Sequence, residues 1–94
     1  MMKQYEIKVT TKFKKQLKRL QKQPNFNYEA LDIVINTLAT NELLPPKNRN
    51  HLLEPKANGI WECHVQPDIL LEYKKIDDML ILILLSIGSH SDLF

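Results

Sequence analysis

Three histidines and two carboxylates in the second half of the chain have residue types and spacings suited to proton transfer. His51, His64 and His90 are the only histidines of the 94 residues. Glu62 and Asp68 lie on either side of the second histidine. A histidine titrates near neutral pH, so it can both accept and donate a proton there. The set suits general acid–base catalysis, with Glu62 as its secondary candidate.

Cleavage of RNA is one reaction with these requirements. One group removes the proton from a 2′-hydroxyl, a second protonates the 5′-oxygen that leaves, and a positive charge stabilises the phosphate. Because the neighbouring hydroxyl is the nucleophile, this reaction requires no metal ion.

Structural and metal-binding roles compete with catalysis at these positions. A lone histidine is more often a surface or hydrogen-bonded structural residue. The three histidines with Asp68 can also bind zinc, but their spacings match no common metal motif. The single cysteine, Cys63, excludes zinc sites built on several thiolates. Trp61 and Phe94 are more often packing residues than platforms for a stacked base.

The first half predicts a strand and two helices. Residues 5–9 alternate apolar and polar side chains, as in a strand with one buried face. A threonine can cap a helix over residues 12–23 that ends at Pro24. Asn27 can cap a second helix that runs to about Thr40. Because few residues separate the two helices, we expect an antiparallel hairpin.

The second half predicts a sheet. Alternating and apolar patterns indicate strands over residues 60–66, 69–76 and 79–87. Strands joined by such short turns must be antiparallel neighbours. Within the first of them, the period of two places Glu62 and His64 on one face.

The predicted fold is α+β. It has an N-terminal strand, an antiparallel helix hairpin and a three- to four-stranded antiparallel twisted sheet with the helices on one face. Residues 51–53 are expected to be a short strand or extended segment. Residues 1–94 form one domain, because so short a chain supports one core. In this sheet His64, Asp68 and His90 can converge at one end.

Composition and charge favour an ordinary globular protein with a polarised surface. Apolar residues make up 44% and charged residues 26%. No segment resembles a signal peptide or a membrane span, and one cysteine fits a reducing cytoplasm. Residues 1–56 carry eleven Lys and Arg against five Asp and Glu, whereas residues 57–94 carry two against six. The basic half can face phosphate, or it can simply be solvated.

Three segments together resemble a known family. They read Glu-Cys-His-Val-Gln-Pro-Asp (62–68), Leu-Leu-Glu-Tyr (70–73) and Gly-Ser-His-Ser-Asp-Leu-Phe (88–94). They resemble the YafQ branch of the RelE/ParE superfamily of toxins. The lysine-rich first helix and the segment Asn-His-Leu-Leu (50–53) fit the same family, so the resemblance covers nearly the whole chain.

The resemblance implies a RelE-like fold and a bacterial toxin of a type II toxin–antitoxin system. Such a toxin is an mRNA interferase, an endonuclease that cleaves messages at the ribosome without a metal or other cofactor. A small antitoxin of the ribbon-helix-helix, DinJ-like kind would neutralise it. The complex would repress its own operon, with operator DNA contacted mainly by the antitoxin.

The resemblance also implies roles for individual residues. His64, Asp68 and His90 fall on positions that would transfer protons. His51 would assist in acid–base work or hold the phosphate, and Phe94 would position the substrate base. Contacts to the RNA backbone would come from Lys14, Lys15, Lys18, Lys47 and Arg49.

The sequence departs from the family pattern at Ser86. Relatives usually carry an arginine there, two residues before the glycine of the closing motif. A serine donates a hydrogen bond but no full charge, and losing one such donor typically costs on the order of a hundred-fold in rate. Either another cation (Arg49, Lys47 or Lys56) has taken over, or the toxin is weak. Ile69 stands where relatives often have tryptophan.

Two other functions stay open on the sequence alone. The first is a catalytically weak or inactive toxin-like binding module that acts through antitoxin and operator regulation. The second is a gyrase poison of the ParE type, which the histidine cluster argues against because that activity needs no acid–base set.

Overall fold

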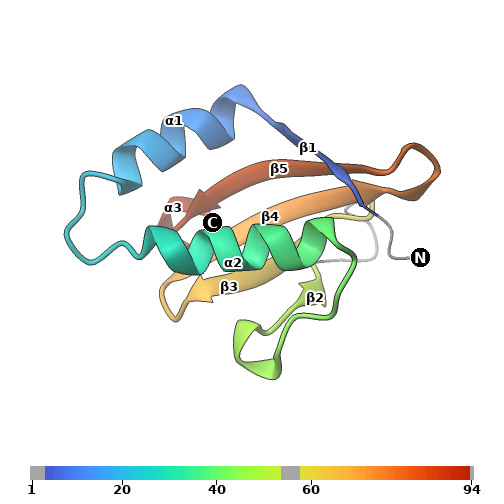
Figure 1. Ribbon diagram of the computed structural model, residues 1–94. Coiled ribbons are helices and arrows are strands. Elements are labelled where there is room, and N and C mark those ends of the chain that lie inside the picture. The colour runs from blue at the N-terminus through green and yellow to red at the C-terminus, as the bar shows by residue number, and fades with distance from the viewer. Residues whose placement is uncertain (1–3, 54–57, 94) are drawn as a thin grey trace.

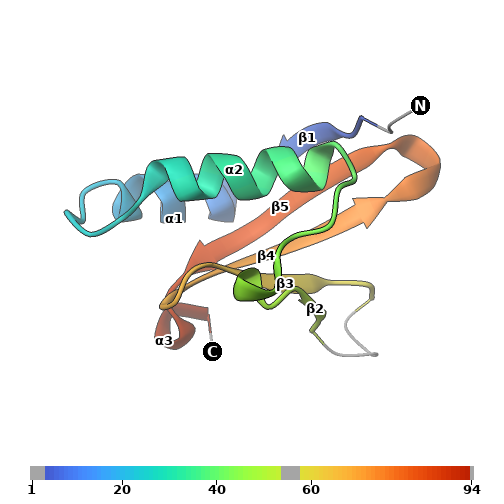
Figure 2. The same cartoon turned by 60° about the horizontal axis from the view of Figure 1, so that its bottom comes forward.

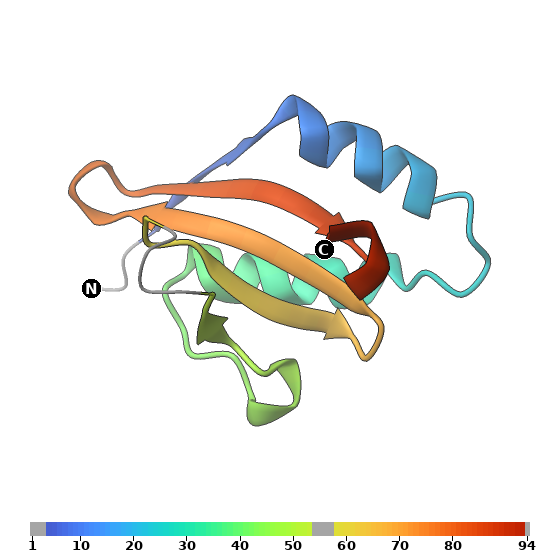
Figure 3. The ribbon, with the colours of Figure 1, turned by 180° about the vertical axis from the view of Figure 1, so that it is seen from behind.

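The computed structural model describes residues 4–53 and 58–93. Two helices lie on one face of a five-stranded sheet (Figure 1), which confirms the predicted α+β class. A short third helix lies on the opposite face, as the view from behind shows (Figure 3). The elements in chain order are β1 (Glu6–Val9), α1 (Thr11–Leu20), α2 (Tyr28–Ala39), the 3-10 turn η1 (Pro46–Asn48), β2 (His51–Leu52), β3 (Trp61–Gln66), β4 (Ile69–Ile76), the 3-10 turn η2 (Asp77–Met79), β5 (Ile81–Gly88) and α3 (His90–Leu93).

The observed sheet has five strands, whereas the predicted antiparallel sheet had three or four. Its order is β1-β5-β4-β3-β2. Neighbours among β2 to β5 pair antiparallel, as their short connections predicted. The N-terminal strand β1 joins the edge as a fifth strand and pairs parallel with β5, so the sheet is mixed.

Side-chain caps start both long helices at the predicted positions. Thr10 Oγ1 accepts from the backbone N–H of Phe13 at 3.0 Å. The same hydroxyl donates to the carbonyl oxygen of Leu85 at 2.7 Å, so the cap also fastens α1 to β5. Asn27 Oδ1 accepts from the backbone N–H of Ala30 at 3.0 Å. The caps therefore set where each helix begins and how α1 lies on the sheet.

Two predicted boundaries are wrong. Helix α1 ends at Leu20, because the backbone N–H groups of Lys22 and Gln23 bond three residues back, to Arg19 and Leu20, and tighten the chain into turns before Pro24. Strand β5 begins at Ile81 rather than Met79, because η2 and the left-handed Leu80 (φ 52°) intervene. The two helices do run in opposite directions on the same face, as predicted (Figures 1 and 2).

A β-bulge in β5 decides which side chains face the core. Residues 72–73 of β4 are consecutive, but their partners in β5 are Ser86 and Leu84. Leu85 is therefore an extra residue, and the alternation of faces shifts by one. Leu84 and Ile87 are both buried under the helices, and Ser86 points to the opposite face.

The core lies between the two long helices and the sheet. Helix residues meet the inner face of the three central strands there, and the main contributors are Phe13, Leu20, Leu31, Val34, Leu38, Cys63, Leu71, Tyr73, Leu82, Leu84 and Ile87.

None of the helices in the described part of the chain has the length and apolar character needed to cross a membrane.

The closing segment forms α3, which the sequence analysis did not predict. Asp92 Oδ2 accepts from the backbone N–H of Ser89 at 3.0 Å, and Ser89 Oγ accepts from the backbone N–H of Asp92 at 3.2 Å. Hydrogen bonds from Ser89 to the Asp92 carboxyl, from its backbone N–H first and its side chain second, lower the pKa of that carboxyl. A Cβ on Gly88 would lie 3.0 Å from the Cβ of Asp92, so a larger residue there would force the Asp92 side chain to shift. His90 is thereby fixed as the first residue of α3.

The bulge predicts unequal effects for two adjacent leucines. Leu84→Ala should lower the free energy of unfolding by about 2–5 kcal/mol, because it opens a cavity in the core. Leu85→Ala, at the half-buried bulge position, should cost only about 1 kcal/mol. Urea denaturation followed by circular dichroism measures both, and equal losses would contradict the bulge.

Candidate active site

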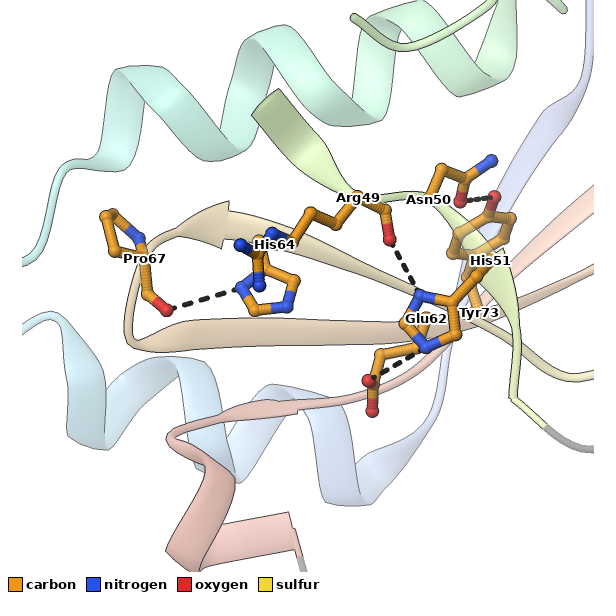
Figure 4. A network of polar contacts seen from close by, with 7 residues as sticks. All are labelled: Arg49, Asn50, His51, Glu62, His64, Pro67 and Tyr73. Atoms are coloured by element: carbon orange, nitrogen blue, oxygen red, sulfur yellow. Dashed lines mark hydrogen bonds and ion pairs between the residues drawn. The ribbon is translucent and has the colours of Figure 1, made fainter. Parts of the chain in front are cut away.

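A row of polar side chains crosses the sheet on the face opposite α1 and α2. His51 pairs with Glu62 across β2 and β3. Glu62 pairs with Glu72, and Glu72 pairs with Ser86 in β5. His51 Nε2 lies 3.4 Å from Glu62 Oε1 (Figure 4), and the Ser86 hydroxyl donates to Glu72 Oε1. These side chains therefore form a continuous polar row.

Glu62 is the most unusual member of this polar row. Glu62 is only 6% exposed, and its Oε2 has no hydrogen-bond partner among the described residues. Its direct neighbour Glu72 is a second carboxylate. Burial, and to a smaller extent the nearby Glu62 carboxylate, raises the pKa of the Cys63 thiol to about 12. This cysteine therefore stays a thiol at neutral pH and does not act as a thiolate nucleophile. A buried carboxylate with an unsatisfied oxygen is costly, which marks the row as a candidate site rather than packing.

His64 lies two residues further along β3 on the same face. Its strand partner is Leu70, which in turn pairs with Gly88. His64 Nδ1 lies 3.3 Å from the carbonyl oxygen of Pro67 (Figure 4). A carbonyl only accepts, so this contact favours the neutral tautomer with the proton on Nδ1 and the lone pair on Nε2. This tautomer can accept a proton from a substrate through Nε2.

His51 has both ring nitrogens next to acceptors. Nδ1 lies 2.7 Å from the carbonyl oxygen of Arg49, and Nε2 faces the Glu62 carboxylate. A doubly protonated ring satisfies both contacts as a donor. In that form His51 offsets the negative charge of Glu62.

The loop before β2 is attached to β3 through a buried amide. Strand β2 pairs with β3 only at Trp61 and Glu62, so the edge of β3 beyond these residues is open. Asn48, 6% exposed, occupies that edge and donates from Nδ2 to the carbonyl oxygen of His64 at 2.7 Å. On the other side of Arg49, Asn50 Oδ1 accepts from the Tyr73 hydroxyl at 2.6 Å.

A cavity of about 570 Å³ opens between this loop, the end of β3 and the start of α2. His64 is one of its walls. Lys47 and Arg49 are the only charged side chains among its described lining residues. Figure 4 shows the Arg49 side chain running from the loop toward His64. The site therefore combines a proton acceptor with positive charge that suits a phosphate group.

Asp68 and His90 lie at the same end of the sheet as His64. Asp68 is exposed in the β3–β4 turn, two residues before Leu70. His90 is exposed at the start of α3, two residues after Gly88. Because His64, Leu70 and Gly88 form one cross-strand row, the register brings both segments to this end (Figure 2). The convergence of the His64, Asp68 and His90 side chains on one site stays a prediction.

Other predicted residues lie elsewhere. Phe94, and Lys56 as an alternative cation, are outside the described residues. The exposed lysines of α1 lie over β5 on the other face of the sheet, away from the cavity; they are Lys14, Lys15 and Lys18. Within the described ranges, no group of three or more His, Cys, Asp or Glu side chains is arranged to hold a metal ion.

Sequence reasoning missed Glu72 and Asn48 as members of the site. Glu72 left a signal, because it is an acid within the apolar strand that the tight turn folds back onto Glu62. Asn48 left none, since its role depends on a loop packing against an open strand edge.

Comparisons with known proteins agree on one family. The family model for YafQ, a bacterial toxin of type II toxin–antitoxin systems, matches residues 5–94. No curated protein matches the chain. A metal-bound toxin from Helicobacter pylori is 38% identical, with 100% of both chains covered and a TM-score of 0.86. The structure of the Escherichia coli DinJ–YafQ complex matches at 30% identity, covering 97% of this chain and 99% of that chain, with a TM-score of 0.86.

The Asn48 contact predicts a stability difference between two asparagines. Asn48→Ala should lower the free energy of unfolding by about 1–3 kcal/mol, because it leaves the His64 carbonyl without its partner. Asn36→Ala, on the exposed face of α2, should stay within about 0.5 kcal/mol of the parent. Urea denaturation compares them, and a similar small effect for both would show that Asn48 does not anchor the loop.

Proposed function

This chain belongs to the YafQ family of bacterial toxins of type II toxin–antitoxin systems, and we propose that it is an endoribonuclease that cleaves mRNA on the ribosome. The observation that supports this most is the placement of His64. Its Nδ1 lies 3.3 Å from the Pro67 carbonyl oxygen, which favours a lone pair on Nε2, and it lines a cavity whose charged walls are Lys47 and Arg49. A base beside a phosphate-binding surface is what RNA cleavage requires.

The proposed reaction uses the substrate's own hydroxyl as nucleophile. His64 Nε2 takes the proton of the 2′-hydroxyl, and the 2′-oxygen attacks the phosphorus. The bond to the 5′-oxygen breaks, and His90 gives that oxygen a proton. The products are a 2′,3′-cyclic phosphate and a 5′-hydroxyl end. No metal-bound hydroxide is needed, because the nucleophile is already in place.

The remaining polar residues support these two proton transfers. Asp68, exposed in the β3–β4 turn at the same end of the sheet, belongs to the proposed proton-transfer set. His51, held between Arg49 and Glu62, assists the acid–base work from the edge of the site. Phe94 keeps its proposed role of positioning the substrate base. Backbone contacts to RNA at the cavity come from Lys47 and Arg49. Lys14, Lys15 and Lys18, on the other face of the sheet, contact ribosomal or messenger RNA outside the site.

We further propose a small DinJ-like antitoxin as the partner that neutralises this toxin. The matching Escherichia coli structure is a DinJ–YafQ complex, which supports a partner of that kind. The ribosome and mRNA are the proposed targets, in the cytoplasm, and operator DNA is contacted through the antitoxin.

The mechanism predicts loss of toxicity on removing either histidine of proton transfer. His64→Ala and His90→Ala should each slow cleavage by about a hundred-fold or more and relieve growth arrest. Primer extension on a message cleaved in a reconstituted translation system measures the rate. A message with a 2′-O-methyl group at the cleaved nucleotide should resist the parent toxin.

The matched control is Lys8→Gln, on exposed β1 at the opposite edge of the sheet, which should cleave like the parent. Full toxicity of both histidine variants would contradict the assigned mechanism.

A catalytically weak binding module is the second candidate, favoured by Ser86. This residue is 1% exposed, and its hydroxyl donates to Glu72, so that position supplies no charge to a phosphate. Under this candidate the chain binds its antitoxin but leaves ribosome-bound mRNA intact, and Ser86→Arg gains toxicity. Under the endoribonuclease proposal the parent already cleaves. Antitoxin co-purification together with the cleavage assay decides between them.

A further inference from the structure

The sheet face around Ser86 is unfavourable for a phosphate. Ser86 is buried, and its hydroxyl donates a hydrogen bond to Glu72. Glu72 lies directly opposite Glu62, so two carboxylates stand side by side on this face. A dianionic transition state placed over them would be repelled, and the single hydroxyl beside them is already in use. The charge that stabilises the reaction must come from another direction.

The open edge of β3 supplies positive charge instead. The cavity beside His64 has Lys47 and Arg49 as its charged walls, and no acidic side chain lines it among the described residues. The Arg49 side chain runs toward His64 (Figure 4). A guanidinium also presents a planar fork that binds two phosphate oxygens at once, which an ammonium cannot do.

The backbone of Arg49 is held on both sides. Before it, the buried Asn48 amide is fastened to the His64 carbonyl at 2.7 Å. Its own carbonyl oxygen accepts from His51 Nδ1 at 2.7 Å, and Asn50 after it accepts from Tyr73. Arg49 itself is left-handed, with φ 47°, a conformation that is strained for an L residue. A strained residue fixed by its neighbours is a feature of pre-organised sites.

We propose that Arg49 is the catalytic cation of this chain: it binds the non-bridging oxygens of the scissile phosphate from the β2–β3 edge, in place of a charge at position 86. The proposal rests on the endoribonuclease function. The phosphate then lies on the Arg49 side of His64, within the cavity, and away from Glu62 and Glu72. Proton transfer by His64 is unchanged, and Arg49 balances the charge that develops on the phosphate.

The test compares single-turnover cleavage of a ribosome-bound, end-labelled mRNA by the parent, Arg49→Gln, Arg49→Lys and Lys8→Gln. Arg49→Gln should lower the rate at saturating ribosome by about a hundred-fold or more. The half-saturating ribosome concentration should change by less than about threefold, because the charge acts mainly on the transition state. Arg49→Lys should recover only part of the rate, and Lys8→Gln should match the parent. Circular dichroism melts confirm that each variant is folded.

The outcomes separate the two proposals. If the parent cleaves and Arg49→Gln cleaves within about threefold of it, the endoribonuclease function stands and the role of Arg49 is overturned. If the parent does not cleave, the endoribonuclease function fails. Fluorescence anisotropy with a short 2′-O-methyl RNA then decides whether Arg49 binds phosphate. An Arg49→Gln variant that binds this RNA as tightly as Lys8→Gln, with the same salt dependence, overturns that as well.

Discussion

The bulge at Leu85 is the constraint on which both faces of the sheet depend. Without it, the alternation that buries Leu82 and Leu84 would turn Ser86 and Gly88 into the core. With it, Ile87 fills the core, and Ser86 joins the polar row of the opposite face. Gly88 then meets α3, where a Cβ would lie only 3.0 Å from the Cβ of Asp92. One inserted residue therefore separates a packing face from a site face.

The two faces make opposite contributions to stability. Cys63, Leu71 and Ile87 are direct strand neighbours, and all are completely buried beneath the helices. Across the sheet, Glu62 and Glu72 form a like-charged pair, which is destabilising at directly opposed positions. The unsatisfied Glu62 oxygen adds a cost of about 1–3 kcal/mol. His51 and Ser86 offset part of this at the two ends of the row. The apolar face thus allows the other face to keep groups that do not favour folding.

Local sequence signals predicted the elements, and nonlocal contacts escaped them. Thr10 and Asn27 predicted where both helices begin, because a helix cap is a contact between residues close together in the sequence. Short turns gave the antiparallel register, and with it the shared end of His64, Asp68 and His90. The bulge could not be predicted from the sequence, because Leu85 is one more apolar residue in an apolar strand. The parallel pairing of β1 with β5 joins the two ends of the chain, so no turn residue specifies it. The site loop was recognised as basic, but its seat on β3 depends on tertiary packing.

The shortness of β2 explains how a loop can supply the charge. A strand longer than His51–Leu52 would pair with the rest of β3 and fill the edge that Asn48 occupies. With that edge open, the buried amide takes the His64 carbonyl, and the chain must turn sharply to reach His51 two residues after Arg49. The left-handed conformation of Arg49 makes this turn. The Arg49 side chain then runs back along β3 toward His64 (Figure 4). An arginine on the sheet would have to compete with Glu72 for its charge, whereas one on this loop approaches from a side without acids among the described lining residues.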